Sequence, residues 1–139
     1  MTSPKHIIKT FIITEIIKTN KQNPRRTDKM ISRNNAEHYI WGNNCDGWRL
    51  INEEDRSIIH ERMPTGTSEI RHLHKKSKQF FFILSGTMTI EADGIEYNLK
   101  EHEGIEVLPT VPHQVFNRTD RDIEFLVISQ PNTRMTGLM

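Results

Sequence analysis

The sequence has a single cysteine, Cys45, in 139 residues, so no disulfide can form within the chain. Nothing in the sequence therefore requires an oxidising compartment, and a cytoplasmic location is the expectation. Apolar runs are also short. None is as long as a membrane span, so the sequence predicts no membrane partner.

The chain lacks a strong charge of either sign, with a formal net charge of +1. Residues 1–29 contain seven Lys or Arg against two acidic residues, which leaves a net charge of −4 on the remainder. A domain that binds nucleic acid usually presents a basic face, so we expect no nucleic-acid partner. We interpret residues 1–29 as an N-terminal extension and residues 30–139 as one domain. The rival interpretation is an added strand or helix that covers this domain or a dimer partner.

Helical periodicity is nearly absent after residue 29. Short strand-like runs alternate with turns, and Asp93-Gly94 has the signature of a two-residue hairpin turn. This pattern predicts an all-β, antiparallel sandwich or barrel, a class that includes the jelly rolls. The residues from 130 to the C-terminus show no pattern. The predicted strands cover residues 57–63, 80–84, 87–92, 95–99, 104–108, 112–117 and 122–129.

Two histidines, His72 and His74, lie one residue apart on a predicted extended segment. Side chains alternate along a strand, so both imidazoles point to the same side. Gln79 opens the next predicted strand, which would bring its amide oxygen towards the same point by turning back. His113 supplies a third imidazole at the start of a later strand. Three neutral nitrogens and an amide oxygen suit a divalent first-row metal.

This spacing resembles the cupin superfamily, in particular the small single-domain metal-binding cupins with a type-2 conserved barrel. The first motif departs in one letter, because Gln79 stands where the family usually has glutamate. In the second motif, the family's Pro-x-Gly turn is replaced by residues 108–110, and His102 stands where the motif opens with glycine. The positions that match the two motifs are Gly66, His72, His74, Gly86, Pro112, His113 and Asn117.

The resemblance implies a double-stranded β-helix, or jelly-roll barrel, with an N-terminal extension. It also implies one divalent transition metal, Mn, Fe, Ni or Zn. Cupins commonly pair through a sheet face, and the run at residues 80–82 leaves at least one phenylalanine on the outer face, so we expect a homodimer. The implied metal ligands are His72, His74, Gln79 and His113.

Because all four ligands are neutral, the ion would keep its full double charge and prefer a small anionic or enolisable substrate. The possible functions are a Lewis-acid isomerase or lyase, a dioxygenase, and a non-catalytic binding module for a sugar or small acid. An enzyme needs a proton-transfer group near the substrate, and the sequence assigns none. We interpret Trp41 and Trp48 as packing residues, and Arg49 and Glu106 as solvated surface. Other polar residues flank the motif: His60, Glu61, Arg62, Glu69 and Arg71.

Overall fold

A computed structural model describes residues 28–136 of the chain. The predicted extension, residues 1–29, lies almost wholly outside the described residues and stays a prediction. The strands described below all lie in one compact unit that begins at residue 31. Within the described residues, no helix is long and apolar enough to cross a membrane.

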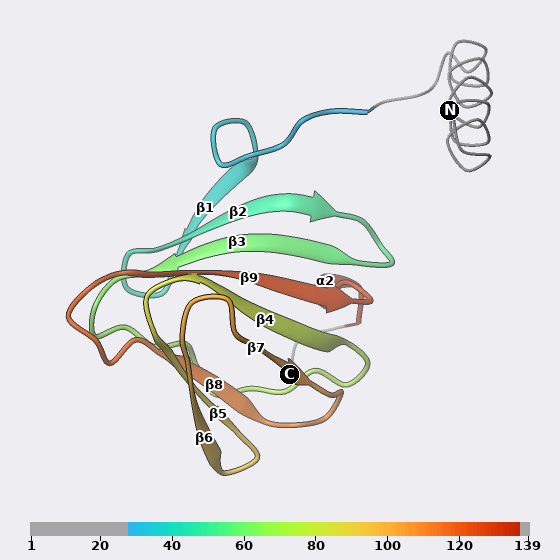
Figure 1. The fold of residues 1–139 in the computed structure, drawn as a ribbon. Coiled ribbons are helices and arrows are strands. Elements are labelled where there is room, and N and C mark those ends of the chain that lie inside the picture. The colour runs from blue at the N-terminus through green and yellow to red at the C-terminus, as the bar shows by residue number, and fades with distance from the viewer. Residues whose placement is uncertain (1–27, 137–139) are drawn as a thin grey trace, which may run out of the picture. The chain divides into compact units, whose positions relative to one another are not determined.

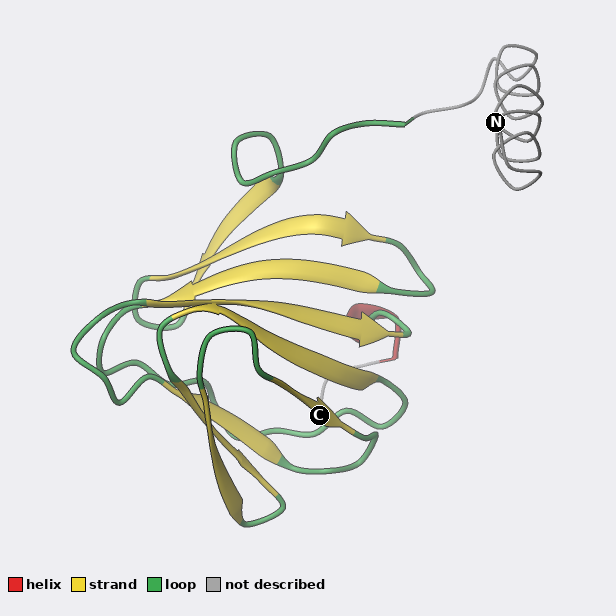
Figure 2. Cartoon of the chain, viewed as in Figure 1, coloured by secondary structure: helices red, strands yellow, loops and turns green. Residues whose placement is uncertain are grey.

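The described unit is built from two antiparallel sheets, as the sequence predicts (Figures 1 and 2). The larger sheet has the order β1-β2-β3-β9-β4-β7, and the smaller has the order β6-β5-β8. A short helix, α2 (Thr133–Thr136), lies in the C-terminal segment where no pattern was seen. The strands are β1 (Glu37–Trp41), β2 (Cys45–Asn52), β3 (Ser57–Met63), β4 (Lys78–Ser85), β5 (Met88–Ala92), β6 (Ile95–Leu99), β7 (Gly104–Val107), β8 (His113–Phe116) and β9 (Ile123–Gln130).

The core follows from the period-two alternation of the strands. In β9 the buried side chains are every second residue, from Ile123 to Ser129, and the intervening residues are partly exposed. β4 alternates in the same way, with Phe81 and Ile83 buried and Phe80 on the outer face. The inward faces of both sheets contribute to one apolar cluster. The jelly-roll prediction is confirmed.

The segment that carries the first two histidines is more irregular than the sequence predicts. It forms two isolated bridges with β8 rather than a regular strand, Ser68 with Phe116 and His72 with His113. The backbone amide of His72 donates to the carbonyl of His113 at 3.0 Å, and the amide of His113 donates to the carbonyl of His72 at 2.8 Å. His72 and His113 are therefore directly opposite each other, which is how two motifs far apart in sequence meet.

Two positions that lack the family's glycine keep a glycine-like backbone. His102 has a φ of 66° and Thr110 has a φ of 72°, both in the left-handed region. A threonine there is strained, because its branched Cβ crowds the backbone. The amide of Thr110 donates to the carbonyl of His74 at 2.7 Å. The turn before His113 is thus retained without its glycine.

Candidate metal centre

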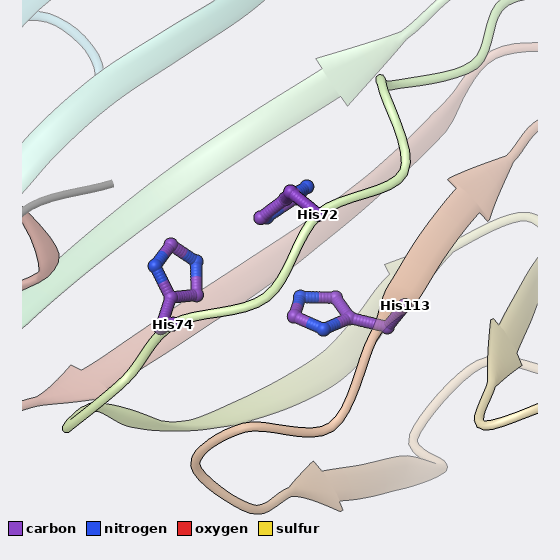
Figure 3. A group of neighbouring side chains, drawn as sticks. All are labelled: His72, His74 and His113. Atoms are coloured by element: carbon purple, nitrogen blue, oxygen red, sulfur yellow. The ribbon is translucent and has the colours of Figure 1, made fainter. Parts of the chain in front are cut away.

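The three histidines converge on one point inside the barrel (Figure 3). Each offers one ring nitrogen, and these atoms all lie within 4.8 Å of one another. His72 and His74 come from the segment before β4, whereas His113 begins β8. His74 and His113 are buried, and His72 is half-buried. The predicted gathering of these three side chains is therefore observed.

Backbone carbonyls fix the tautomer of two of the imidazoles. The Nδ1 of His72 lies 2.7 Å from the carbonyl oxygen of Ile70, and the Nδ1 of His113 lies 2.9 Å from that of Val111. A carbonyl only accepts, so each Nδ1 carries the proton in the neutral ring. The lone pair of each Nε2 is then free to face a metal ion.

His74 has no hydrogen-bond partner for either ring nitrogen, although the residue is only 4% exposed. Buried polar atoms are normally paired, so an orphaned imidazole needs a ligand that is not protein. Burial, followed by repulsion from His72 and His113, lowers the pKa of His74 to about 4. Burial also lowers the pKa of His113. Both rings are neutral at pH 7, which is the form that binds metal.

Gln79 lies beside the histidines, as the sequence predicts. Its Nε2 donates to the hydroxyl of Ser129 at 3.1 Å, and its Oε1 lies 3.0 Å from the Nε2 of His113. Because Nδ1 of His113 carries the proton, Nε2 of His113 and Oε1 of Gln79 are both acceptors. A cation between them resolves the conflict, and two ligands on metal bonds of about 2.1 Å at right angles are about 3.0 Å apart. Without a cation, a flipped amide would resolve it instead.

Asn117, the last residue of the second motif, does not belong to the centre. Its Nδ2 donates to the carbonyls of Met63 and Arg121, at 2.9 and 2.8 Å. Its Oδ1 accepts from the amide and the hydroxyl of Thr119. All of its polar atoms are used in holding the loop between β8 and β9, so its role is structural.

A cavity of about 200 Å³, here called the inner chamber, contains His72, His74 and Gln79. A second cavity of about 460 Å³, the outer chamber, shares three of its lining residues, Glu61, Glu69 and His72. Two carboxyl groups and one imidazole therefore line both chambers. The other residues of the inner chamber are Tyr39, Ile59, Phe81, Val127, Ser129 and Thr133. The other residues of the outer chamber are Trp41, Gly42, Ser68 and Ile70.

The two carboxyl groups are chemically unusual. Both keep some accessible surface where they line the chambers, and protein surrounds the rest of each side chain. Burial raises the pKa of Glu61 to about 8, and burial followed by repulsion from Glu61 raises that of Glu69 to about 8. The Glu69 carboxylate accepts from the amide of Val115 at 3.1 Å, and the hydroxyl of Tyr39 donates to Glu61 at 3.5 Å. The sequence identified both only as polar residues that flank the motif, not as residues that line a cavity.

Tyr39 is held against Glu61 by the absence of a side chain at Gly47, its partner in the β1–β2 ladder. A Cβ at Gly47 would lie 2.2 Å from Cζ of the tyrosine ring. We expect Gly47→Ala to lower the free energy of unfolding by about 1–3 kcal/mol, measured by chemical denaturation, because the ring must move. A Tyr39→Ala/Gly47→Ala double variant should recover part of the loss. Simple additivity of the two single changes would contradict the clash.

The remaining flanking residues lie outside the chambers. His60 pairs with Glu124 at 2.8 Å, and Arg62 donates to Asp46 at 2.6 Å. Glu106 is exposed on β7, as expected. The other arginines are used in ion pairs, Arg49 with Glu37 and Arg71 with Glu91.

The two tryptophans differ in position. Trp48 lies outside the chambers, between the rings of His38 and His60, with ring centroids 5.3 Å from each. Trp41 lines the outer chamber. It also packs partly against the core, so its interpretation as a packing residue alone was incomplete.

A family model described as the cupin domain matches residues 59–129, about half of the chain. The chain belongs to the cupin superfamily. A curated relative, an uncharacterized protein from Methanocaldococcus jannaschii, is 25% identical over 76 residues, which are 55% of this chain and 61% of the relative. This cupin therefore spans about three fifths of the length of that relative.

Solved cupin structures are similar in fold to this chain. KdgF from Halomonas sp. has a TM-score of 0.70 at 12% identity, with 76% of this chain and 96% of that one covered. The polyketide cyclase RemF from Streptomyces resistomycificus has a TM-score of 0.68 at 16% identity, with 76% and 81% covered. A sugar phosphate isomerase from Silicibacter pomeroyi has a TM-score of 0.66 at 20% identity, with 75% and 76% covered. At these identities the likeness concerns the fold alone.

Proposed function

We propose that this cupin is a metal-dependent enzyme that moves a proton on a small enolisable substrate, in an isomerase or lyase reaction. The observation that carries the proposal is that two protonatable carboxyl groups, Glu61 and Glu69, line the same inner chamber as His72 and His74, two members of the histidine cluster. A binding module needs no such groups, whereas proton transfer does.

The residues present fit a divalent ion. His74 has two orphaned ring nitrogens, and His72 and His113 have Nε2 lone pairs left free by their carbonyl contacts. We propose these three imidazoles and the Gln79 amide oxygen as the ligands. The identity of the ion, Mn, Fe, Ni or Zn, is open to measurement. When bound, the ion would supply Lewis-acid polarisation of a substrate carbonyl or enol oxygen.

The two carboxyl groups would then carry the proton. A carboxyl with a pKa near 8 is largely protonated at pH 7, so it can donate; once ionised, it is a stronger base than an ordinary glutamate. Repulsion between Glu61 and Glu69 favours one shared proton on the pair. One group would remove a proton next to the substrate carbonyl, and the other would return a proton at the neighbouring atom.

The structural neighbours support a small-molecule substrate. By name, one is a polyketide cyclase and another is a sugar phosphate isomerase. A Lewis-acid proton transfer in this chain is compatible with either class of substrate. The neutral ligand set also leaves the full charge of the ion to stabilise an anionic form of the substrate, such as an enolate.

Hydrogen exchange tests the proposal. In deuterium oxide, the chain loaded with one equivalent of Zn²⁺ is expected to speed exchange of the CH₂ protons of hydroxyacetone, followed by NMR. A chelator should abolish the effect, and added Zn²⁺ should restore it. Stoichiometric metal without exchange on any enolisable compound would favour the binding module. About one iron per chain after purification, with oxygen uptake on substrate, would favour a dioxygenase.

We also propose that the cupin acts as a homodimer in the cytoplasm. Phe80 is 37% exposed on the outer face of β4, and its ring lies 6.1 Å from that of Phe82. Such a pair on an open sheet face is typically covered by a partner. Light scattering at micromolar concentration is expected to give twice the monomer mass, and Phe80→Glu to halve it. A wild-type monomer would contradict this.

A further inference from the structure

The outer chamber is built differently from the inner one. Its residues beyond the shared three include Trp41, Gly42 and Ile70, which present apolar surface or no side chain. Ile70 is 86% exposed and is absent from the apolar core, so packing does not explain it. The indole Nε1 of Trp41 already donates to the carbonyl of Asp46, at 3.3 Å. The remaining surface of that ring is apolar, and part of it lines the chamber.

Positive charge is missing from both chambers. Among the described residues that line them, none is lysine or arginine. The nearby arginines are occupied elsewhere: Arg49 pairs with Glu37, Arg62 with Asp46 and Asp122, and Arg71 with Glu91. A phosphate or carboxylate in the outer chamber would face two glutamates with no side-chain cation. Recognition of such groups in proteins usually relies on arginine or lysine.

From this arrangement, and resting on the proposed function, we propose the substrate class. The substrate is a neutral enolisable carbonyl compound with a flat apolar ring. Its oxygen-bearing end enters the inner chamber past Glu61 and Glu69, and its ring stays in the outer chamber between Trp41 and Ile70. Sugar phosphates and small carboxylates are disfavoured. The earlier expectation of an anionic or enolisable substrate is therefore narrowed to a neutral compound that becomes negatively charged only when it loses a proton.

The ring and the charge can be tested separately with four probes. α-Hydroxyacetophenone and hydroxyacetone are neutral and differ only in a phenyl ring against a methyl group. Phenylpyruvate and pyruvate carry a carboxylate and differ in the same phenyl ring. Each is titrated into the full Zn²⁺-loaded chain by calorimetry, after the metal content has been measured. α-Hydroxyacetophenone is expected to bind most tightly, roughly 10- to 100-fold more tightly than hydroxyacetone, as burial of much of a phenyl ring supports.

Variants assign that preference to the chamber. Trp41→Leu is expected to reduce the phenyl-to-methyl affinity ratio several-fold with unchanged metal content. Ile70→Asp should act in the same direction, and it replaces a side chain outside the core, so the test does not depend on the stability of the tryptophan variant. Trp48→Leu is the matched control, because that ring lies outside the chambers. It should leave the ratio unchanged.

The outcomes separate the two proposals. Three results would overturn the substrate class and leave the metal centre intact. They are a phenyl-to-methyl affinity ratio near one, tighter binding of the carboxylates than of the neutral compounds, and a ratio that is unchanged in both chamber variants. A wild-type chain that takes up no Zn²⁺ would overturn the proposed function and this inference with it. If the wild type prefers the neutral phenyl compound and both chamber variants lose that preference, the result supports the proposed substrate class.

Discussion

Replacing His72 and His74 together by alanine is expected to abolish metal binding. The wild type, purified without chelator or nickel affinity resin, should contain about one divalent ion per chain by elemental mass spectrometry. The double variant should contain none, because it removes two of the three converging imidazoles. The ring of His74 has no protein hydrogen bond to lose, and the loss of His72 removes only its bond to the carbonyl of Ile70, an exposed residue. The variant should therefore still fold.

A thermal measurement checks the same result independently. A ligand that binds only the folded state at a hundredfold excess over its Kd stabilises that state by about 2.7 kcal/mol. Added Zn²⁺ should thus raise the Tm of the wild type by several degrees and leave the double variant unchanged. His60→Ala is the matched control, since that histidine pairs with Glu124 outside the chambers. Equal metal content in the wild type and the double variant would contradict the proposal that His72 and His74 are metal ligands.

The closeness of His72, His74 and Gln79 could be predicted because it depends on local spacing. His72 and His74 share a face on any extended segment, and Gln79 is the second residue of β4, which lies between β9 and β7. The pairing of His72 with His113 joins positions 41 residues apart, and only the resemblance to a family pattern supplied it. Residue spacing within one segment says nothing about which distant segment will pair with it.

The carboxyl groups were harder to assign, for two different reasons. Glu61 shares its side of β3 with Ile59 and buried Met63, so a carboxyl on an apolar face was a signal in the sequence. No such signal identified Glu69. Strict alternation of side chains back from His72 would point Glu69 outward and Ile70 inward, whereas Ile70 is in fact exposed. The segment is irregular there, with isolated bridges in place of a continuous strand, so alternation does not apply. Its geometry depends on the loop and on β8.

Replacing Glu61 and Glu69 together by glutamine is expected to remove catalysis and keep the metal. Glutamine matches glutamate in size but cannot take up or release a proton. Hydroxyacetone exchange by the Zn²⁺-loaded chain should fall by about 10²- to 10⁴-fold, the usual contribution of a positioned acid or base. Each single variant should show a large part of this loss, because one group is proposed to remove a proton and the other to return one. Glu106→Gln, on the exposed face of β7, is the control.

The dependence on pH has a definite sign. Removing a proton from substrate requires an ionised carboxylate, so the exchange rate should rise with pH and level off above the pKa of the pair. In the metal-free protein that pKa is about 8 for each group, and a nearby divalent cation lowers it by favouring the charged form. In the metal-loaded enzyme, the increase of the exchange rate with pH should therefore have its midpoint below pH 8. In the double variant this increase should be absent. If the double variant keeps both its metal and its exchange rate, the two glutamates are not the proton carriers, and the cavity must recruit a base from the substrate or from solvent.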